Sequence, residues 1–443
     1  MVRIGLMAKR NSPTSRRTLL SALSASALVP LLPRRSLAGE GPKALLLRAS
    51  ESKIALRQGD AETPIWSLDG PTPGLPLRFK RGDQVEIAVR NDLPVPIALN
   101  LRGVDGNSTA EPLTARSPLA AGGKTAFSVS LRHAGTFLCD IRLLAEGAGA
   151  SRSLPLLVEE ASAISDRDEI FLVEDWRIRP NGTAVAPGTA PGDAALLLTV
   201  NGRLMPDISV RSGERLRFRF INGCQRQVIA IKLEGHNVQV IALDGQPSEP
   251  FLARNGALVL APGGRADALI DATAPPGSIS TILLHNGKEA RPVARLLTST
   301  EPAVRSQPLP PALQLPSNGL PAQLDLRNAQ RIELALTGSE WVPPATFATS
   351  LAPAFRTKVG RIVVLGLTNR GTTTTVFHLH GHHVRLLDRL DDGWKPYWLD
   401  TLAVEPGQTE RIAFAAEYSG RWLMEAAGTD WAAPKLLRWY SVE

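Results

Sequence analysis

Apolar and polar residues alternate along much of the chain, a pattern typical of β-strands that are buried on one face. One segment, a glycine turn followed by alternating residues and a closing asparagine, occurs at residues 82–91, 213–222 and 360–369. In the second copy, Leu216, Phe218 and Phe220 take the apolar positions and charged residues lie between them. Repetition of one strand unit at long range indicates three related domains.

Two further features follow each copy in the same order. An x-Leu-x-Gly sequence occurs at residues 100–103, 232–235 and 378–381, and a glycine turn that opens another strand occurs at residues 122–124, 262–264 and 406–408. Gly and Pro turns are frequent, and no long amphipathic helix interrupts them. The pattern predicts an all-β protein of three consecutive Greek-key β-sandwich or barrel domains.

The expected domain limits follow from composition. Residues 159–166 form a plausible first linker, and the proline-rich residues 306–321 a second one that should be extended and stiff. We therefore expect domains at residues 40–160, 165–303 and 320–443, with a proline-rich linker at residues 304–319.

The first 38 residues have the pattern of an export signal. Ser15-Arg16-Arg17-Thr18-Leu19-Leu20 resembles a twin-arginine motif, a weakly apolar stretch follows, and Ser36-Leu37-Ala38 is a small-x-small cleavage pattern. We expect export to the periplasm through the twin-arginine machinery. The alternative is a basic N-terminal anchor that stays attached. Because no later run of about 20 apolar residues occurs, no integral membrane segment is expected in the mature chain.

Most of the net positive charge belongs to this leader. The chain has a formal charge of +8, of which seven positive charges come from the leader: Arg3, Lys9, Arg10, Arg16, Arg17, Arg34 and Arg35. No acidic residue precedes Glu40, so removal of the leader leaves about +1. A nearly neutral mature chain argues against a nucleic-acid partner.

The chain has two cysteines, Cys139 and Cys224, which are too few for a disulfide framework. They lie in different repeats, so a disulfide would have to join two domains. Two unpaired, buried thiols are the simpler expectation.

The segment Phe377-His378-Leu379-His380-Gly381-His382 is the most informative for chemistry. Two imidazoles at alternate positions of a strand lie on the same face, and imidazole is a good copper ligand. The segment resembles the His-Pro-Phe-His-Leu-His-Gly-His motif of the multicopper oxidases. The resemblance extends over nearly the whole chain after the leader, including residues 66–74, 200–202, 244–247 and 261–267. It implies that the three domains are cupredoxin-like.

The resemblance also implies where copper ligands should lie. Family oxidases hold one electron-accepting copper with two His, a Cys and often a Met, and a three-copper cluster with four His-x-His pairs between the first and third domains. In this sequence only the pair His378 and His380 matches. The other cluster positions correspond to Asn100, Arg102, Asp140, Arg142, Glu425 and Ala427, and those of the electron-accepting copper to Thr375, Ala426 in place of the Cys, Trp431 and Leu436.

Two histidines cannot hold three copper ions, so oxidase activity by the family mechanism is not expected. Charged residues at the other positions suggest a different structure. Because isolated buried charge is costly, we expect an interdomain salt-bridge network in which Arg102 or Arg142 contacts Glu425. The alternative is that these residues are solvated at a rim.

One metal hypothesis stays open. His378, His380 and His382 could share a face, with His383 adjacent, and bind at most one Cu or Zn ion; no other cofactor is expected. Gly381 is expected to kink the strand, and buried, hydrogen-bonded histidines are the ordinary alternative. The other histidines, His133, His236 and His285, are expected to be structural. Three acidic residues, Asp391, Asp392 and Asp400, surround Trp394 and Trp398, and they form either a recognition surface or a solvated acidic loop.

Because most of the motif's ligand positions hold other residues, the sequence resembles the copper-free FtsP/SufI-like branch of the superfamily. That branch implies a non-enzymatic periplasmic scaffold, an envelope or cell-division accessory protein whose partners are unidentified envelope proteins. Two alternatives are a periplasmic copper-handling protein that uses the histidine cluster and an active multicopper oxidase.

Overall fold

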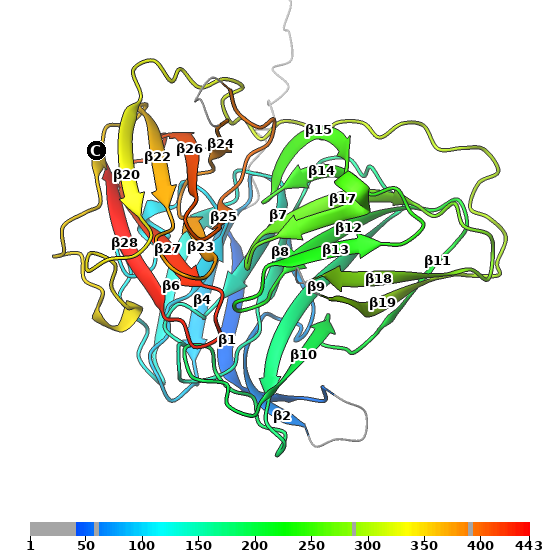
Figure 1. Cartoon of the computed structure of the whole chain (residues 1–443), viewed down its shortest axis with the longest axis horizontal. Helices are drawn as coiled ribbons and strands as arrows, with labels where there is room; N and C mark the ends of the chain where they lie inside the picture. The colour runs from blue at the N-terminus through cyan, green and yellow to red at the C-terminus, as the bar shows by residue number, and fades with distance from the viewer. Residues whose placement is uncertain (1–40, 57–61, 286–288, 389–392) are drawn as a thin grey trace, which may run out of the picture. The chain divides into compact units, whose positions relative to one another are not determined.

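The computed structural model describes residues 41–56, 62–285, 289–388 and 393–443. Pairs of β-sheets follow one another along these residues, at 43–159, 167–298 and 330–442, and we call them the first, second and third domain (Figure 1). The all-β prediction is confirmed, whereas the domain limits given above stay a prediction. The expected leader, Asp391 and Asp392 lie outside the described residues.

The first domain combines sheets of strand order β2-β1-β4-β6 and β3-β8-β7-β5. Its elements are β1 (Lys43–Ile54), β2 (Thr63–Asp69), β3 (Leu77–Lys80), β4 (Gln84–Asn91), β5 (Asn100–Arg102), the 3-10 helix η1 (Ser108–Ala110), β6 (Lys124–Ser130), β7 (Gly135–Asp140) and β8 (Leu154–Glu159). In β4 every second residue is buried, so the alternation in the sequence places Val85, Ile87 and Val89 in the core.

The second domain combines sheets β10-β9-β12-β17-β14-β15 and β11-β19-β18-β13-β16. Its elements are β9 (Arg167–Ile178), β10 (Ala195–Val200), β11 (Asp207–Val210), β12 (Arg215–Asn222), β13 (Ile229–Leu233), β14 (Gln239–Leu243), β15 (Gln246–Leu252), η2 (Arg254–Gly256), β16 (Ala257–Leu260), β17 (Arg265–Asp271), β18 (Ile279–His285) and β19 (Ala290–Thr298). Phe218 and Phe220 stack in the core, with ring centroids 5.3 Å apart.

The third domain combines sheets β20-β22-β26-β24 and β21-β28-β27-β23-β25. Its elements are β20 (Gln330–Ala335), η3 (Pro344–Thr346), β21 (Arg356–Thr357), β22 (Ile362–Thr368), β23 (Thr375–Leu379), β24 (Arg385–Leu386), β25 (Thr401–Val404), β26 (Thr409–Ala415), β27 (Gly420–Gly428) and β28 (Lys435–Val442). Phe377, Phe414 and Trp422 are buried in its core.

The three sequence repeats have the same place in each domain. They form β4, β12 and β22, and each of these strands pairs in parallel with the first long strand of its domain, namely β1, β9 and β20. Each also pairs in antiparallel fashion with the strand that follows the next glycine turn, namely β6, β17 and β26. The repeats are therefore copies of one structural unit.

The closing asparagine has the same role in all three repeats, and Asn91, Asn222 and Asn369 are all fully buried. In each case the side-chain amide donates to backbone carbonyls of the following loops, and the side-chain oxygen accepts from the N–H two residues later. Asparagine is required because it supplies both donors and an acceptor to buried backbone groups.

The linker contacts the folded body. Leu315 is buried against Ile241 and Leu269 of the second domain. Asn318 donates to the carbonyl of Ala134 in the first domain, at 2.8 Å, and to Gln246 Oε1 in the second, at 3.0 Å. This segment therefore takes part in the packing between domains.

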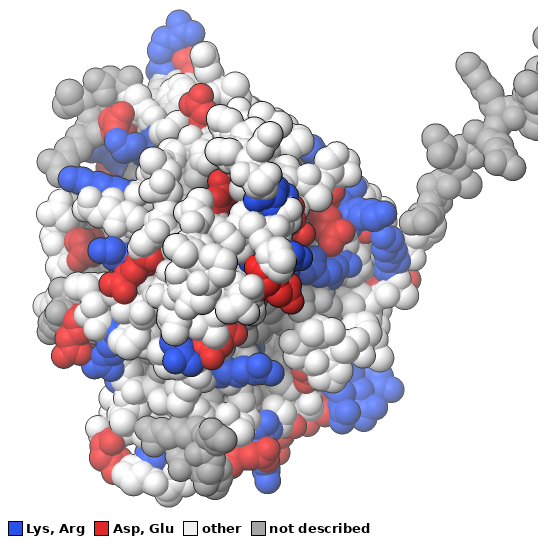
Figure 2. All heavy atoms as spheres, turned by 90° about the vertical axis from the view of Figure 1, so that its right-hand side faces the viewer, with Lys and Arg blue, Asp and Glu red and all other residues white. Residues whose placement is uncertain are grey.

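Cys139 and Cys224 are free and buried, which confirms two unpaired thiols. Among the described residues, no helix has the length and apolar character needed to cross a membrane. On the face shown in Figure 2, basic and acidic side chains are interspersed.

Candidate functional site

Strand register brings together the positions predicted from the copper motif. In the first domain, Asn100 of β5 lies opposite Asp140 of β7. In the third domain, His378 of β23 lies opposite Glu425 of β27 (Figure 1). Side chains from these two pairs meet between the first and third domains, because Asn100 donates to Glu425 Oε1 at 3.0 Å.

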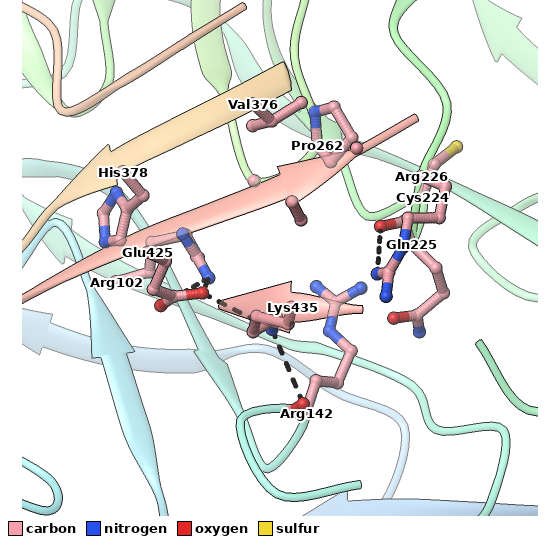
Figure 3. Close-up of a pocket in the computed structure, with 13 residues that line it drawn as sticks. Arg102, Arg142, Cys224, Gln225, Arg226, Pro262, Val376, His378, Glu425 and Lys435 are labelled. Carbon is pink, nitrogen blue, oxygen red and sulfur yellow. Dashed lines mark hydrogen bonds and ion pairs between the residues drawn. The ribbon is translucent and has the colours of Figure 1, made fainter. Parts of the chain in front are cut away.

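Glu425 is the centre of a buried polar cluster. Arg102 Nη2 lies 3.1 Å and 3.2 Å from its two carboxylate oxygens, and Lys435 Nζ lies 3.4 Å from Oε2 (Figure 3). The predicted contact between Arg102 and Glu425 is thus confirmed, and the alternative of solvated rim residues is wrong. Burial alone would raise the pKa of Glu425, but Arg102, Lys435 and His380 hold it well below its ordinary value.

His380 lies between two carboxylates. Its Nδ1 is 2.8 Å from Glu111 Oε1, and its Nε2 is 2.8 Å from Glu425 Oε1. Burial would lower the pKa of His380, yet the two carboxylates raise it to about 9, so the imidazole is charged at neutral pH. Glu111 was not anticipated, because it comes from the loop after η1 and no sequence spacing connects it to His380.

Arg142 has a different role from Arg102. It makes no ion pair with Glu425; its Nη1 donates to the carbonyl of Gly223 at 2.9 Å, and its Nη2 lies 3.8 Å from Asp140 Oδ2. Lys435 approaches the Arg142 carbonyl at 3.5 Å (Figure 3). Arg142 therefore connects the first domain to the second. Lys435 was not anticipated either, although a lysine at the start of a largely apolar strand could have indicated a buried partner.

A small cavity of about 40 Å³ lies beside this cluster, lined by Arg102, Arg142, His378, Glu425 and Lys435 among others. A space of that size accommodates only a few water molecules. Arg102, Glu425 and Lys435 extend toward one another beside this cavity (Figure 3).

His378 belongs to the edge of the cluster. Its Nδ1 is 2.9 Å from Thr401 Oγ1 and 3.0 Å from the carbonyl of Asp400. Burial, with Arg102 nearby, lowers the pKa of His378 to about 4, so it is neutral beside the charged His380. Together with Glu425, these two histidines offer ligand atoms within 4.8 Å of one another.

His382 does not join this group, so the predicted face of three histidines is wrong. Gly381 adopts φ +77°, β23 ends at Leu379, and the chain turns. The expected kink is confirmed. The His382 ring enters the core of the third domain, where its Nδ1 is 2.8 Å from Tyr440 Oη, and burial lowers its pKa to about 4.

His383 and His133, by contrast, meet at a second buried cluster. His383 Nδ1 is 2.5 Å from Asp105 Oδ2, and His133 Nδ1 is 3.9 Å from the same oxygen. Gln246 of the second domain contacts His133 Nδ1 at 2.9 Å. Asp105, His133 and His383 also have ligand atoms within 4.8 Å of one another, so this is a second group with the donor types of a metal site.

Asp400 corrects the expectation of a solvated acidic loop, because it is only 1% exposed. Arg265 of the second domain pairs with both of its oxygens, at 2.9 Å and 2.6 Å, and also donates to the carbonyl of Thr136 in the first domain. Burial would raise the pKa of Asp400, but Arg265 and His378 hold it well below its ordinary value.

Comparison with known proteins agrees with this architecture. Three family models described as multicopper oxidase match residues 49–139, 169–291 and 323–440. The chain belongs to the multicopper oxidase superfamily. Its sandwiches are therefore the three cupredoxin-like domains of that superfamily.

Several relatives show how far the similarity extends. Multicopper oxidase MmcO of Mycobacterium tuberculosis is 24% identical, over 80% of this chain and 78% of that protein. Laccase-6 of rice (Oryza sativa subsp. japonica) is 24% identical, but the match spans only 41% of its length and 48% of this chain.

Solved structures share the fold. A multi-copper oxidase from Pseudomonas thermotolerans superposes with a TM-score of 0.77 at 24% identity, over 91% of this chain and 99% of that one. Lac15 from a marine microbial metagenome gives a TM-score of 0.74 at 26% identity, over 90% of this chain and 100% of that one.

The positions that the family motif assigns to the electron-accepting copper contain apolar or hydroxyl groups. Ala426 lies at the position that the motif assigns to the thiolate and is packed in the core of the third domain. Trp431 donates through Nε1 to the carbonyl of Ala186, and Thr375 is buried. Among the described residues, neither group of potential metal ligands includes Thr375, Ala426, Trp431 or Leu436.

Proposed function

We propose that this protein is an exported multicopper oxidase homologue that has lost its copper centres and acts through protein contacts. Its role would be that of a non-enzymatic periplasmic scaffold, as in the FtsP/SufI-like branch, in envelope maintenance or cell division. The contact between Arg102 and Glu425 carries this proposal, because it lies where the family motif assigns cluster ligands.

The donor set does not fit a three-copper cluster. Arg102 and Arg142 contribute positive charge and no ligand atom, and guanidinium groups remain protonated in proteins. Both nitrogens of His380 face carboxylates at 2.8 Å, so a copper ion would have to displace an ion pair that compensates buried charge. Ala426 offers no thiolate for electron transfer from a substrate.

Copper loading of the mature protein tests this proposal. After incubation with excess Cu(II) and removal of unbound ions, elemental analysis should find no stoichiometric copper. Absorption should show no blue band, and neither a phenol nor Cu(I) should be oxidised. Several bound copper atoms together with oxygen consumption would refute the proposal.

One observation favours a second candidate, a single Cu or Zn ion at His378, His380 and Glu425, whose ligand atoms converge. A Cu or Zn ion accepts such nitrogen and carboxylate donors. Calorimetric titration with Zn(II) and Cu(II) separates the candidates. One ion bound by the wild type but not by His378→Gln would support a copper-handling role, with His236→Gln as a control outside both clusters.

The location is a separate part of the proposal and has its own test. Replacement of Arg16 and Arg17 by Lys should leave the full chain in the cytoplasm, as judged by cell fractionation. Unchanged export of this variant would exclude the twin-arginine route.

A further inference from the structure

In the part of the chain that the structure describes, buried arginines are paired with carboxylates, with one exception. Eight arginines of the described residues are buried. Seven have a carboxylate oxygen within 4.0 Å: Arg102, Arg142, Arg215, Arg217, Arg219, Arg226 and Arg265. The eighth, Arg385, is 8% exposed and has no carboxylate within that distance among the described residues. Buried charge without a counter-ion is costly, so its retention requires an explanation.

The free edge of Arg385 is the one that usually pairs with a carboxylate. Its Nε has no hydrogen-bond partner, and Nη2 reaches only the carbonyl of Ala322 at 3.5 Å. In Arg215 the same two nitrogens bind both oxygens of Asp271, at 2.7 Å and 2.8 Å. Burial lowers the pKa of Arg385, and no carboxylate of the described residues offsets this effect.

Two tryptophans fix the position of this guanidinium. It lies 4.6 Å from the ring centroid of Trp398 and 5.8 Å from that of Trp394. Nη1 donates to the carbonyl of Lys395 at 3.2 Å. Stacking on aromatic faces keeps the donors of an arginine oriented.

Arg385 lines a cavity of about 410 Å³ between β15, the linker and residues 394–398. Ser248 also lines it; this residue is 2% exposed, and its hydroxyl has no hydrogen-bond partner. Glu249, at the same cavity, is not in ion-pair distance of Arg385, and the nearby Lys395 pairs with Asp388 at 2.7 Å. The volume is that of a small-molecule site.

We propose that this cavity binds a carboxylate attached to an aromatic or apolar group. Arg385 pairs with the two carboxylate oxygens, Ser248 donates a further hydrogen bond, and Trp394 and Trp398 contact the apolar part. The ligand is a free small carboxylate or the C-terminal carboxylate of a peptide. This inference is independent of the copper content of the protein, because none of these residues belongs to the Glu425 cluster.

Calorimetric titration of the whole mature protein with matched probes tests the inference. Benzoate should bind, whereas benzamide, which has a similar shape and no charge, should bind at least about tenfold more weakly. A short peptide ending in phenylalanine is titrated in parallel, with a free and with an amidated C-terminus. Binding of benzoate alone identifies a small-molecule site, and tighter binding of the free peptide identifies a partner's C-terminus.

Variants assign the binding to this cavity. Arg385→Gln should weaken carboxylate binding by at least about tenfold, and Ser248→Ala by a smaller factor. Arg421→Gln is the matched control, since Arg421 is an exposed arginine that stacks on Trp439 elsewhere, and it should leave binding unchanged. If Arg385→Gln does not fold, Arg385→Lys keeps the charge but loses the planar edge, and should also weaken binding.

Two results would overturn the inference. One is that the folded wild type binds neither benzoate nor the free peptide at millimolar concentrations. The other is that Arg385→Gln or Arg385→Lys, folded as shown by an unchanged Tm, binds the carboxylate as tightly as the wild type.

Discussion

At the residue scale, the Glu425 cluster shows how ionic side chains occupy positions that the family motif assigns to metal ligands. Arg102, Lys435 and the charged His380 surround one carboxylate that is 4% exposed. Each positive charge is stabilised by Glu425. The contributions of these residues to the free energy of unfolding are therefore coupled and cannot be added residue by residue.

Removal of that single negative charge should be strongly destabilising. Glu425→Gln removes the carboxylate that Arg102, Lys435 and His380 share, and leaves only Glu111 beside His380 and the more distant Asp140 beside Arg102. It should lower the free energy of unfolding by about 3–5 kcal/mol. Urea denaturation measures this loss. Glu443→Gln is the control, because Glu443 pairs with Arg356 at an exposed position, where ion pairs contribute little. Equal stability of the two variants would contradict a central role for Glu425.

The pair of Asp105 and His383 predicts a dependence on pH. Burial would lower the pKa of His383, but Asp105 and Asp400 raise it to about 9, above the value of about 6.5 in the unfolded chain. Stabilisation by the charged imidazole is therefore complete below about pH 6.5 and is lost as the pH rises through about 9. Asp105 stays ionised throughout, because its pKa is lowered.

The measurement is the difference in unfolding free energy between wild type and His383→Gln. We expect this difference to be largest near pH 6 and to shrink between about pH 7 and 10. His236→Gln should show no such change in this range, since burial lowers the pKa of His236 instead. A constant difference for His383→Gln would argue against a charged His383.

At the scale of elements, the turn after β23 decides which histidines meet. Gly381 at φ +77° ends the alternation, so His382 enters the core and His383 reaches the second cluster. A Cβ at this position would also collide with the Trp422 ring. The position therefore requires glycine for two reasons, backbone conformation and close packing.

Gly381→Ala should consequently cost about 2–4 kcal/mol, from backbone strain and from overpacking together. Gly360→Ala separates the two effects. Gly360 has a similar φ of +80°, but a Cβ there would meet no atom within 4 Å, so only the backbone strain of about 1–2 kcal/mol remains. Thermal unfolding of both variants measures the difference, and similar losses would exclude the packing effect.

At the scale of the whole folded body, buried polar contacts connect all three domains. Arg265 of the second domain binds Asp400 of the third and the carbonyl of Thr136 in the first, and is itself 0% exposed. Asn318 of the linker joins the first and second domains at a nearby point. These contacts favour unfolding of the domains as one cooperative unit.

Arg265→Met should remove this coupling. It leaves Asp400 buried without its cation and should cost about 3–5 kcal/mol. Calorimetry should show a single transition for the wild type and separate transitions for the variant. Arg295→Met is the control, because Arg295 pairs with Asp207 at the surface of the second domain. A single, unshifted transition in Arg265→Met would refute the coupling.

The sequence by itself determined the all-β class, the threefold repetition and the superfamily. Alternation, turn glycines and the closing asparagines are local or periodic requirements of each strand unit, so they are visible without coordinates. The match of His378 and His380 to the motif was equally visible. The motif also placed Arg102 and Arg142 near Glu425, although the sequence did not show which of the two arginines makes the contact.

Only the tertiary structure decided which side chains complete each cluster. Glu111 and Arg265 reach their partners from segments far apart in the sequence, and no spacing predicts such contacts. Lys435 reaches Glu425 from the adjacent strand, through the pairing of β27 with β28. The division of the four neighbouring histidines also depended on one backbone torsion, at Gly381, and on the packing around it. A buried charge is compensated by side chains that are close to it in space, and these side chains come together only when the domains pack against one another.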